Sequence, residues 1–95
     1  MVKSYLDSAN ELFKAELTLK TEEECKAFFE DLCTVKEILD MAQRYDVAKL
    51  LSVGNNYVEI AKATGASTAT ISRVNKCLTY GTGYKTAIER TKESK

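Results

Sequence analysis

The sequence contains no histidine and no proline, and only 4 of its 95 residues are glycine. Without histidine, Ser-His-Asp catalysis, Cys-His catalysis and histidine-ligated metal sites are excluded. The shortage of proline and glycine favours helices over a turn-rich β fold. There is also no apolar run of the roughly 18 residues that a membrane span needs, and the charged amino terminus lacks the apolar stretch of a signal peptide. We therefore expect a cytoplasmic all-α protein that is not an enzyme.

Cysteine is scarce as well, and its spacing does not indicate a metal site or a disulfide framework. The three residues, Cys25, Cys33 and Cys77, are far apart and form no C-x-x-C motif. We expect them to be free, buried thiols in a reducing cytoplasm, with no metal and no cofactor. None of them has a neighbouring base that could activate it as a nucleophile.

The charge of the chain is balanced overall but unevenly distributed. The sequence has 14 basic and 14 acidic residues, with 44% apolar residues, as expected for one globular domain. Residues 1–56 contain 7 basic and 11 acidic residues, whereas residues 57–95 contain 7 basic and 3 acidic ones. A polyanion would be attracted only by the second part, although an ordinary fluctuation of surface charge would produce the same asymmetry.

The first half of the chain predicts scaffold helices. One helix is expected from Ser4, as its cap, to about Leu19, and a second begins at the capping box Thr21–Glu24. The apolar face of the second helix consists of Cys25, Phe28, Phe29, Leu32 and Cys33. A third capping box at 34–37 opens the stretch 34–53, which forms one helix or two and ends at Gly54. The aromatic side chains of this half, including Tyr45, are interpreted as core or interface residues.

The second half predicts two helices joined by a tight turn. Asn56 can cap a helix that begins at Tyr57, with Glu59 as its reciprocal capping partner. Gly65 supplies the left-handed backbone that a short turn requires, and Ser67 can cap the following helix, which extends to about Thr79. The spacing of the apolar residues Ile60, Ile71 and Val74 directs them to the core. This arrangement is typical of a helix-turn-helix.

The outer face of the second of these helices indicates nucleic-acid binding. Its residues are short or basic, and no Asp or Glu occurs from Lys62 to Tyr84. Small residues permit close approach to base edges, hydroxyl groups form hydrogen bonds with them, and basic residues bind phosphates. A merely solvated face of a helical hairpin would usually carry acids. The predicted DNA contacts are Lys62, Ser67, Thr68, Ala69, Thr70, Ser72, Arg73 and Lys76.

The stretch from Glu59 to Arg73, with its Gly-Ala-x-x-Ala-Thr-Ile-x-Arg core, resembles the helix-turn-helix of the Trp repressor family. The stretches around 31–34, 44–48 and 75–81 are similar to the YerC/YecD branch of that family. The resemblance covers roughly residues 16–84 and implies an all-α fold for the single domain over 1–95 that the length of the chain predicts. It would comprise dimerisation helices at about 4–53, the helix-turn-helix at 56–79 and a C-terminal helix or frayed tail at 84–95. It also implies an interlocked homodimer, which suits a small chain that buries little of its surface alone.

The sequence departs from the family at the positions that would hold tryptophan. The pattern has glycine after the recognition-helix arginine, where Val74 would fill the space for an indole ring. Cys77 replaces a small hydroxyl residue, whereas Arg73 matches the arginine that pairs with a carboxylate or a phosphate. Arg44 aligns with the arginine beside the ring across a gap. Arg44, Arg73, Val74 and Cys77 therefore remain candidates for binding an unidentified small-molecule effector, and tryptophan is not expected as a ligand.

The sequence thus predicts a cytoplasmic, homodimeric transcriptional regulator that binds double-stranded DNA and is expected to act as a repressor. The alternative is a helical dimer that binds a protein partner instead of DNA. These two functions differ in their expected salt dependence, since only phosphate contacts give a steep slope.

Overall fold

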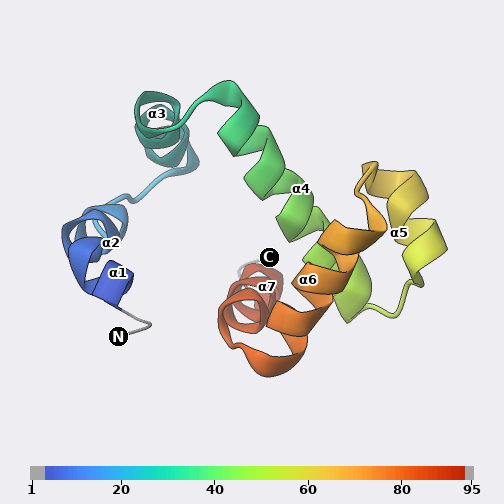
Figure 1. Cartoon of the computed structure of the whole chain (residues 1–95). Helices are drawn as coiled ribbons and strands as arrows, with labels where there is room; N and C mark the ends of the chain where they lie inside the picture. The colour runs from blue at the N-terminus through green and yellow to red at the C-terminus, as the bar shows by residue number, and fades with distance from the viewer. Residues whose placement is uncertain (1–3, 94–95) are drawn as a thin grey trace. The chain divides into compact units, whose positions relative to one another are not determined.

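The computed structural model describes residues 4–93, and within that range it contains seven helices and no strand (Figure 1). Side chains are described for residues 5–92. The all-α class expected from the sequence is confirmed. The chain divides into two compact units, Met1–Ile38 and Leu39–Lys95.

The first unit opens with two short helices where the sequence predicted one. Helix α1 spans Ser4–Ser8 and α2 spans Asn10–Glu16, separated by Ala9 at φ −93° and ψ 6°. Helix α2 ends at Glu16, before the predicted end at about Leu19, and the Thr18 hydroxyl donates to the carbonyl oxygen of Ala15 at 2.6 Å just after it. The predicted capping role of Ser4 concerns a side chain that lies outside the described residues.

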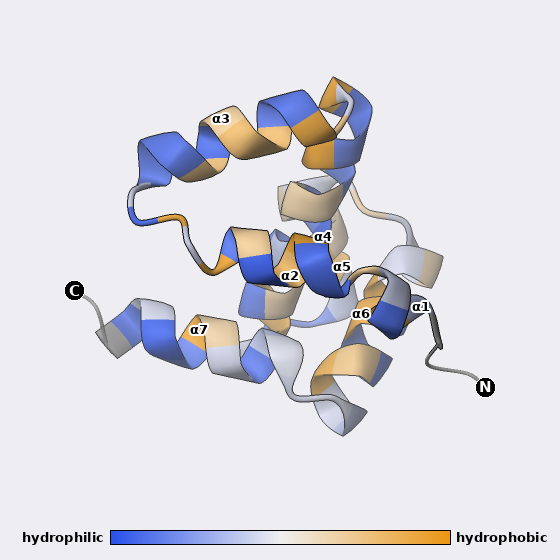
Figure 2. Cartoon of the chain, turned by 90° about the vertical axis from the view of Figure 1, so that its left-hand side faces the viewer, coloured by the Kyte–Doolittle hydropathy of each residue, from blue (hydrophilic) through white to orange (hydrophobic). Residues whose placement is uncertain are grey.

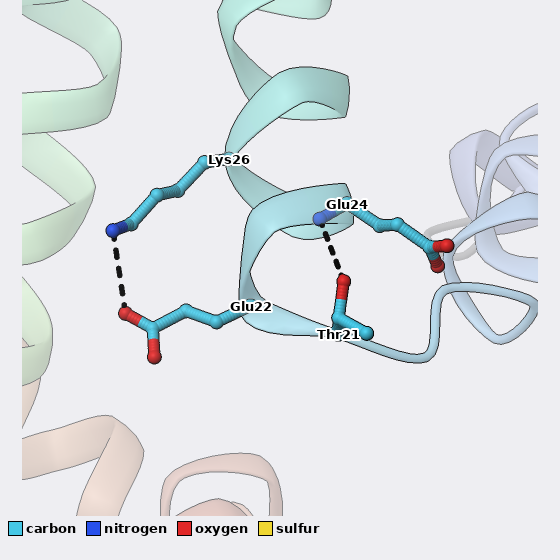
Figure 3. A network of polar contacts seen from close by, with 4 residues as sticks. All are labelled: Thr21, Glu22, Glu24 and Lys26. Carbon is cyan, nitrogen blue, oxygen red and sulfur yellow. Dashed lines mark hydrogen bonds and ion pairs between the residues drawn. The ribbon is translucent and has the colours of Figure 1, made fainter.

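Helix α3 spans Glu22–Leu32 and begins at the cap that the sequence predicted (Figure 3). The amide of Glu24 donates to Oγ1 of Thr21 at 3.1 Å, and Lys26 pairs with Glu22 at 3.5 Å. The returning bond differs from a standard capping box, because the Glu24 carboxylate accepts from the amide of Lys20 at 2.8 Å. The acidic residues of the first turn therefore fix the start of α3 and complement its helix dipole.

The first unit has no buried side chain among residues 5–38. Phe28 and Phe29 are half-buried and meet edge to face, with their ring centroids 6.0 Å apart. Hydrophobic and hydrophilic residues alternate along α3 (Figure 2). The expectation of buried thiols is wrong for Cys25, which is exposed in the first turn of α3, and Cys33 is only half-buried. The unit thus exposes an apolar surface that its own helices do not cover.

Helix α4, Val35–Ser52, is continuous, which answers the question of one helix or two. The capping box at its start is complete, because the Thr34 and Glu37 side chains each accept from the other residue's amide, at 3.1 and 2.8 Å. Gly54 ends it at φ +96°, and its amide donates to the carbonyl oxygen of Leu51 at 3.1 Å. The helix begins in the first unit, and its residues from Leu39 onward belong to the second.

The second unit contains the hydrophobic core of the described chain. It is built by the rest of α4 with α5 (Tyr57–Thr64), α6 (Thr68–Tyr80) and α7 (Gly83–Glu93), and α6 packs against both α5 and α7 (Figure 1). The buried side chains are Val47, Ala48, Ile60, Ala66, Ile71, Val74 and Ile88. The core role predicted for Ile60, Ile71 and Val74 is confirmed. For 84–95 the sequence predicts either a C-terminal helix or a frayed tail, and α7 shows that 84–93 are helical. Residues 94–95 lie outside the described residues.

Among the described residues, no helix combines the length and the hydrophobicity needed to cross a membrane. In the same part of the chain, His, Cys, Asp and Glu side chains do not gather in threes as metal ligands would.

Candidate nucleic-acid interface

The helix-turn-helix forms where the sequence placed it, because both of its helices have capped amino ends. The Asn56 carboxamide accepts from the amide of Glu59 at 2.9 Å, and the Glu59 carboxylate accepts from the amide of Asn56 at 2.9 Å. This is the complete capping box expected for α5. At the start of α6, the Ser67 hydroxyl accepts from the amide of Thr70 at 3.1 Å. The predicted caps of both helices are confirmed.

The turn between the helices depends on Gly65 and on a threonine that the sequence analysis did not single out. Gly65 has φ +74°, and its amide donates to the carbonyl oxygen of Ala61 at 2.8 Å. The Thr64 hydroxyl donates to the carbonyl oxygen of Ile60 at 2.8 Å and accepts from the amide of Ala66 at 3.1 Å. Threonine thus satisfies backbone groups on both sides of the turn, which fixes the direction in which α6 leaves it.

A contact from α4 holds this turn in place. The Gln43 carboxamide donates to the carbonyl oxygen of Thr64 at 3.1 Å, across 21 positions of sequence. The same helix contributes Val47 and Ala48 to the core beneath α5 and α6. The two-helix motif is therefore fixed to a third helix through both a polar and an apolar contact. Sequence reasoning missed Gln43 because no local pattern connects it with the turn.

Helix α6 has one buried side and one exposed side. Ile71 and Val74 are 0% and 1% exposed, whereas the residues between and around them on the other side lie at the surface. The exposed predicted contacts are Lys62 on α5 and Ser67, Thr68, Ala69, Ser72, Arg73 and Lys76. Helix α6 contains no acidic residue. Its exposed face has small or hydroxyl-bearing residues at the amino end and two cations, Arg73 and Lys76, further along.

Thr70 differs from the other predicted contacts. Its side chain is half-buried, and its hydroxyl oxygen accepts from the Ser67 hydroxyl at 3.1 Å. The hydroxyl groups of Ser67 and Thr70 therefore bond to each other within the first turn of α6. Thr68 and Ser72 are exposed at the surface next to this pair.

The four candidate effector residues differ in their exposure. Arg73 and Cys77 are exposed one turn apart on α6, Arg44 is half-buried on α4, and Val74 faces the core. The expected burial of the Cys77 thiol is wrong, because Cys77 lies outside the apolar stripe of α6 that contains Ile71 and Val74. A cavity of about 240 Å³ lies between α4 and α7 of the second unit, and its lining includes Tyr45, Lys49, Ser52, Val53, Ile88, Thr91 and Lys92.

Comparison with known proteins places this helical arrangement in a family. The Trp repressor protein family matches residues 7–92. The chain belongs to the Trp repressor family. At the level of that family, the match supports a DNA-binding regulator.

Relatives within the Trp repressor family share both sequence and fold with the chain. The uncharacterized protein YerC of Bacillus subtilis (strain 168) is 54% identical over 86 residues, which cover 90% of this chain and 83% of YerC. A TrpR-like protein from Eubacterium eligens is 51% identical with a TM-score of 0.84, over 90% of this chain and 89% of that one. A candidate Trp repressor from Staphylococcus aureus is 45% identical with a TM-score of 0.88, over 97% and 95%.

Proposed function

We propose that the chain is a sequence-specific DNA-binding regulator of transcription that acts as a repressor. It binds the major groove as a homodimer through α6. The observation that carries this proposal is the exposed, acid-free face of α6. Thr68, Ala69 and Ser72 offer small or hydroxyl-bearing side chains for base edges. The cations that would bind DNA phosphates are Lys62, Arg73 and Lys76.

The first unit supports the homodimer in this proposal. Its apolar side chains at Leu17, Val35 and Leu32 are exposed, and none of its residues from 5 to 38 is buried. The first unit contains 5 basic and 9 acidic residues and the second 9 and 5, so the two carry opposite net charges. A second copy of the chain would cover these apolar residues and would bring complementary charges together.

In-vitro selection on random duplex DNA tests this proposal. A two-fold symmetric dimer is expected to enrich a palindrome whose half-sites lie about 34 to 36 Å apart. Enrichment of an asymmetric site bound by one chain would contradict the dimer. If no sequence is enriched and the chain binds a protein partner with weak salt dependence, the alternative of a protein-interaction module is correct.

The roles assigned to Lys76 and Thr68 differ, and two alanine variants separate them. Lys76→Ala is expected to weaken binding to all duplexes similarly and to reduce the slope of log K against log salt by about 1 per subunit contact. Thr68→Ala is expected to change base preference at one position of each half-site by about 1 to 3 kcal/mol. Titrations of the selected palindrome and of its point variants at several salt concentrations measure both effects.

An equal loss from Thr68→Ala on every duplex would contradict its assignment to base readout. An unchanged salt slope for Lys76→Ala would contradict its assignment to a phosphate. Neither residue belongs to the buried core, so the variants are expected to retain the wild-type fold, which circular dichroism checks.

We also propose that DNA binding does not require tryptophan. Val74 is 1% exposed, so its two methyl groups occupy core volume at the position where the family pattern has glycine. The affinity for the selected palindrome is therefore expected to be the same with and without saturating L-tryptophan. Binding that appears only after tryptophan is added would show that the Val74 side chain does not close the indole site.

A further inference from the structure

The exposed face of α6 continues beyond the predicted DNA contacts to its last residue. Tyr80 follows Lys76 by one helical turn and Ser72 by two, so the three residues lie along one stripe. The Tyr80 side chain is 85% exposed, and its ring is therefore not used to fill the core of this chain. An aromatic ring with a hydroxyl group thus lies at the carboxyl end of the face proposed to contact DNA.

A lysine from the next helix lies beside this end of α6. The Nζ atom of Lys85, in the first turn of α7, is 3.4 Å from the carbonyl oxygen of Thr79. The positive charge complements the negative end of the α6 dipole. A lysine ammonium has three donor hydrogens, and Lys85 is exposed, so this contact leaves donors for a further acceptor.

The surroundings of this pair favour an anion. Helix α6 and the first turn of α7 contain no Asp or Glu, and the nearest acidic residue in sequence is Glu89, one helical turn after Lys85. Helix α6 has 13 residues, which corresponds to a length of about 20 Å. The major groove is about 12 Å wide. A helix of this length whose amino end contacts base edges extends to the level of the phosphates.

We infer that Tyr80 and Lys85 form a second phosphate-binding site, which contacts the DNA backbone at the carboxyl end of α6. The Tyr80 hydroxyl and the Lys85 ammonium donate to oxygens of one phosphate in each half-site, separate from the phosphate bound by Lys76. Tyrosine and lysine are both common donors to DNA phosphates. This inference rests on the proposed function, since it assigns two further residues to the same interface.

Neutral phosphate scanning of the selected palindrome tests this assignment. Each phosphate is replaced in turn by an uncharged methylphosphonate, and the affinity of the full-length chain is measured for every duplex. Lys85→Gln is expected to weaken binding about tenfold. At one phosphate of each half-site, the methylphosphonate lowers the affinity of the wild-type chain, and this sensitivity is expected to be absent in Lys85→Gln. The same variant is also expected to reduce the salt slope by about 1 per subunit.

Three further variants complete the test, of which Lys85→Arg and Lys92→Gln are the controls. Tyr80→Phe retains the ring and is expected to reduce the sensitivity at the same phosphate without changing the salt slope. Lys85→Arg retains the positive charge and is expected to keep both the wild-type salt slope and the loss of affinity when that phosphate is replaced. Lys92→Gln removes one charge from the same helix, two turns away, and is expected to leave the phosphate map unchanged. Thermal unfolding identifies any variant whose fold has changed through loss of the contact to Thr79.

The outcomes separate this inference from the proposed function. Suppose that Lys76→Ala abolishes the sensitivity at one phosphate, whereas Lys85→Gln leaves the phosphate map unchanged, as Lys92→Gln is expected to do. The second phosphate site then does not exist, although the proposed DNA binding stands. If no palindrome is enriched and no variant changes a salt slope, the proposed function itself is wrong. If Tyr80→Phe raises the concentration at which the dimer dissociates and leaves the phosphate map unchanged, Tyr80 belongs to the subunit interface, and the inference is overturned.

Discussion

Replacing Ser72 with glutamate is expected to weaken binding to the selected palindrome by about 100-fold or more. Ser72 is exposed near the middle of α6, one turn after Thr68 and one turn before Lys76. A carboxylate at this position would face the negatively charged DNA. It would also form an i,i+4 ion pair with Lys76 and so neutralise a cation that is proposed to bind phosphate. Fluorescence anisotropy at a fixed salt concentration measures the loss.

Ser72→Gln is the matched control, because glutamine has nearly the same size as glutamate and no charge. It is expected to lose much less affinity than Ser72→Glu. Both replacements are better helix formers than serine, so neither should unfold α6, and thermal unfolding verifies this. Equal losses from the two variants would indicate that bulk at Ser72 matters and charge does not. If neither variant loses affinity, the face of α6 that contains Ser72 does not contact DNA.

The helix-turn-helix could be predicted from the sequence because its boundaries are set locally. The capping box of Asn56 and Glu59 spans four consecutive residues, and Gly65 adopts the positive φ that a short turn requires. The caps at Ser67 and Thr34 are local in the same sense. The side of α6 that packs inward could also be predicted, because Ile71 and Val74 are apolar residues three positions apart.

Features that depend on contacts distant in sequence could not be predicted. The bond from Gln43 to Thr64 has no sequence signature, because glutamine occurs equally well on a solvated helix face. The phosphate site proposed for Tyr80 and Lys85 depends on α7 packing against α6, which no spacing within either helix specifies.

The errors at the cysteines have a related cause. Cysteine is commonly buried, and that average determined the expectation for all three thiols. Cys77, however, lies on the exposed side of α6, and Cys25 belongs to a unit with no buried side chain among residues 5–38. The break between α1 and α2 at Ala9 was missed because the apolar spacing continues through it. Average preferences therefore failed for Cys25, in a unit whose side chains from 5 to 38 are not buried, and for Cys77, which lies outside the apolar stripe of α6.

The interface depends on the core beneath it, and Ile71→Ala is expected to show this through a large loss of stability. Ile71 is 0% exposed and lies between the half-buried Thr70 and the exposed Ser72. Truncating a fully buried isoleucine lowers the free energy of unfolding by about 2 to 5 kcal/mol, because transfer energy is lost and a cavity remains. Ile71→Val should cost only about 0.5 to 1.5 kcal/mol. Urea unfolding should show a lower midpoint with an unchanged slope.

Val58→Ala is the control for this measurement, because Val58 is 68% exposed on α5 and should change the free energy of unfolding by less than about 0.5 kcal/mol. All variants must be compared at one protein concentration, since the stability of a dimer depends on concentration. An equal loss from Val58→Ala and Ile71→Ala would mean that a partner chain covers Val58 as fully as the core covers Ile71. A loss confined to Ile71 would mean that the second unit fixes the exposed face of α6 through its own core.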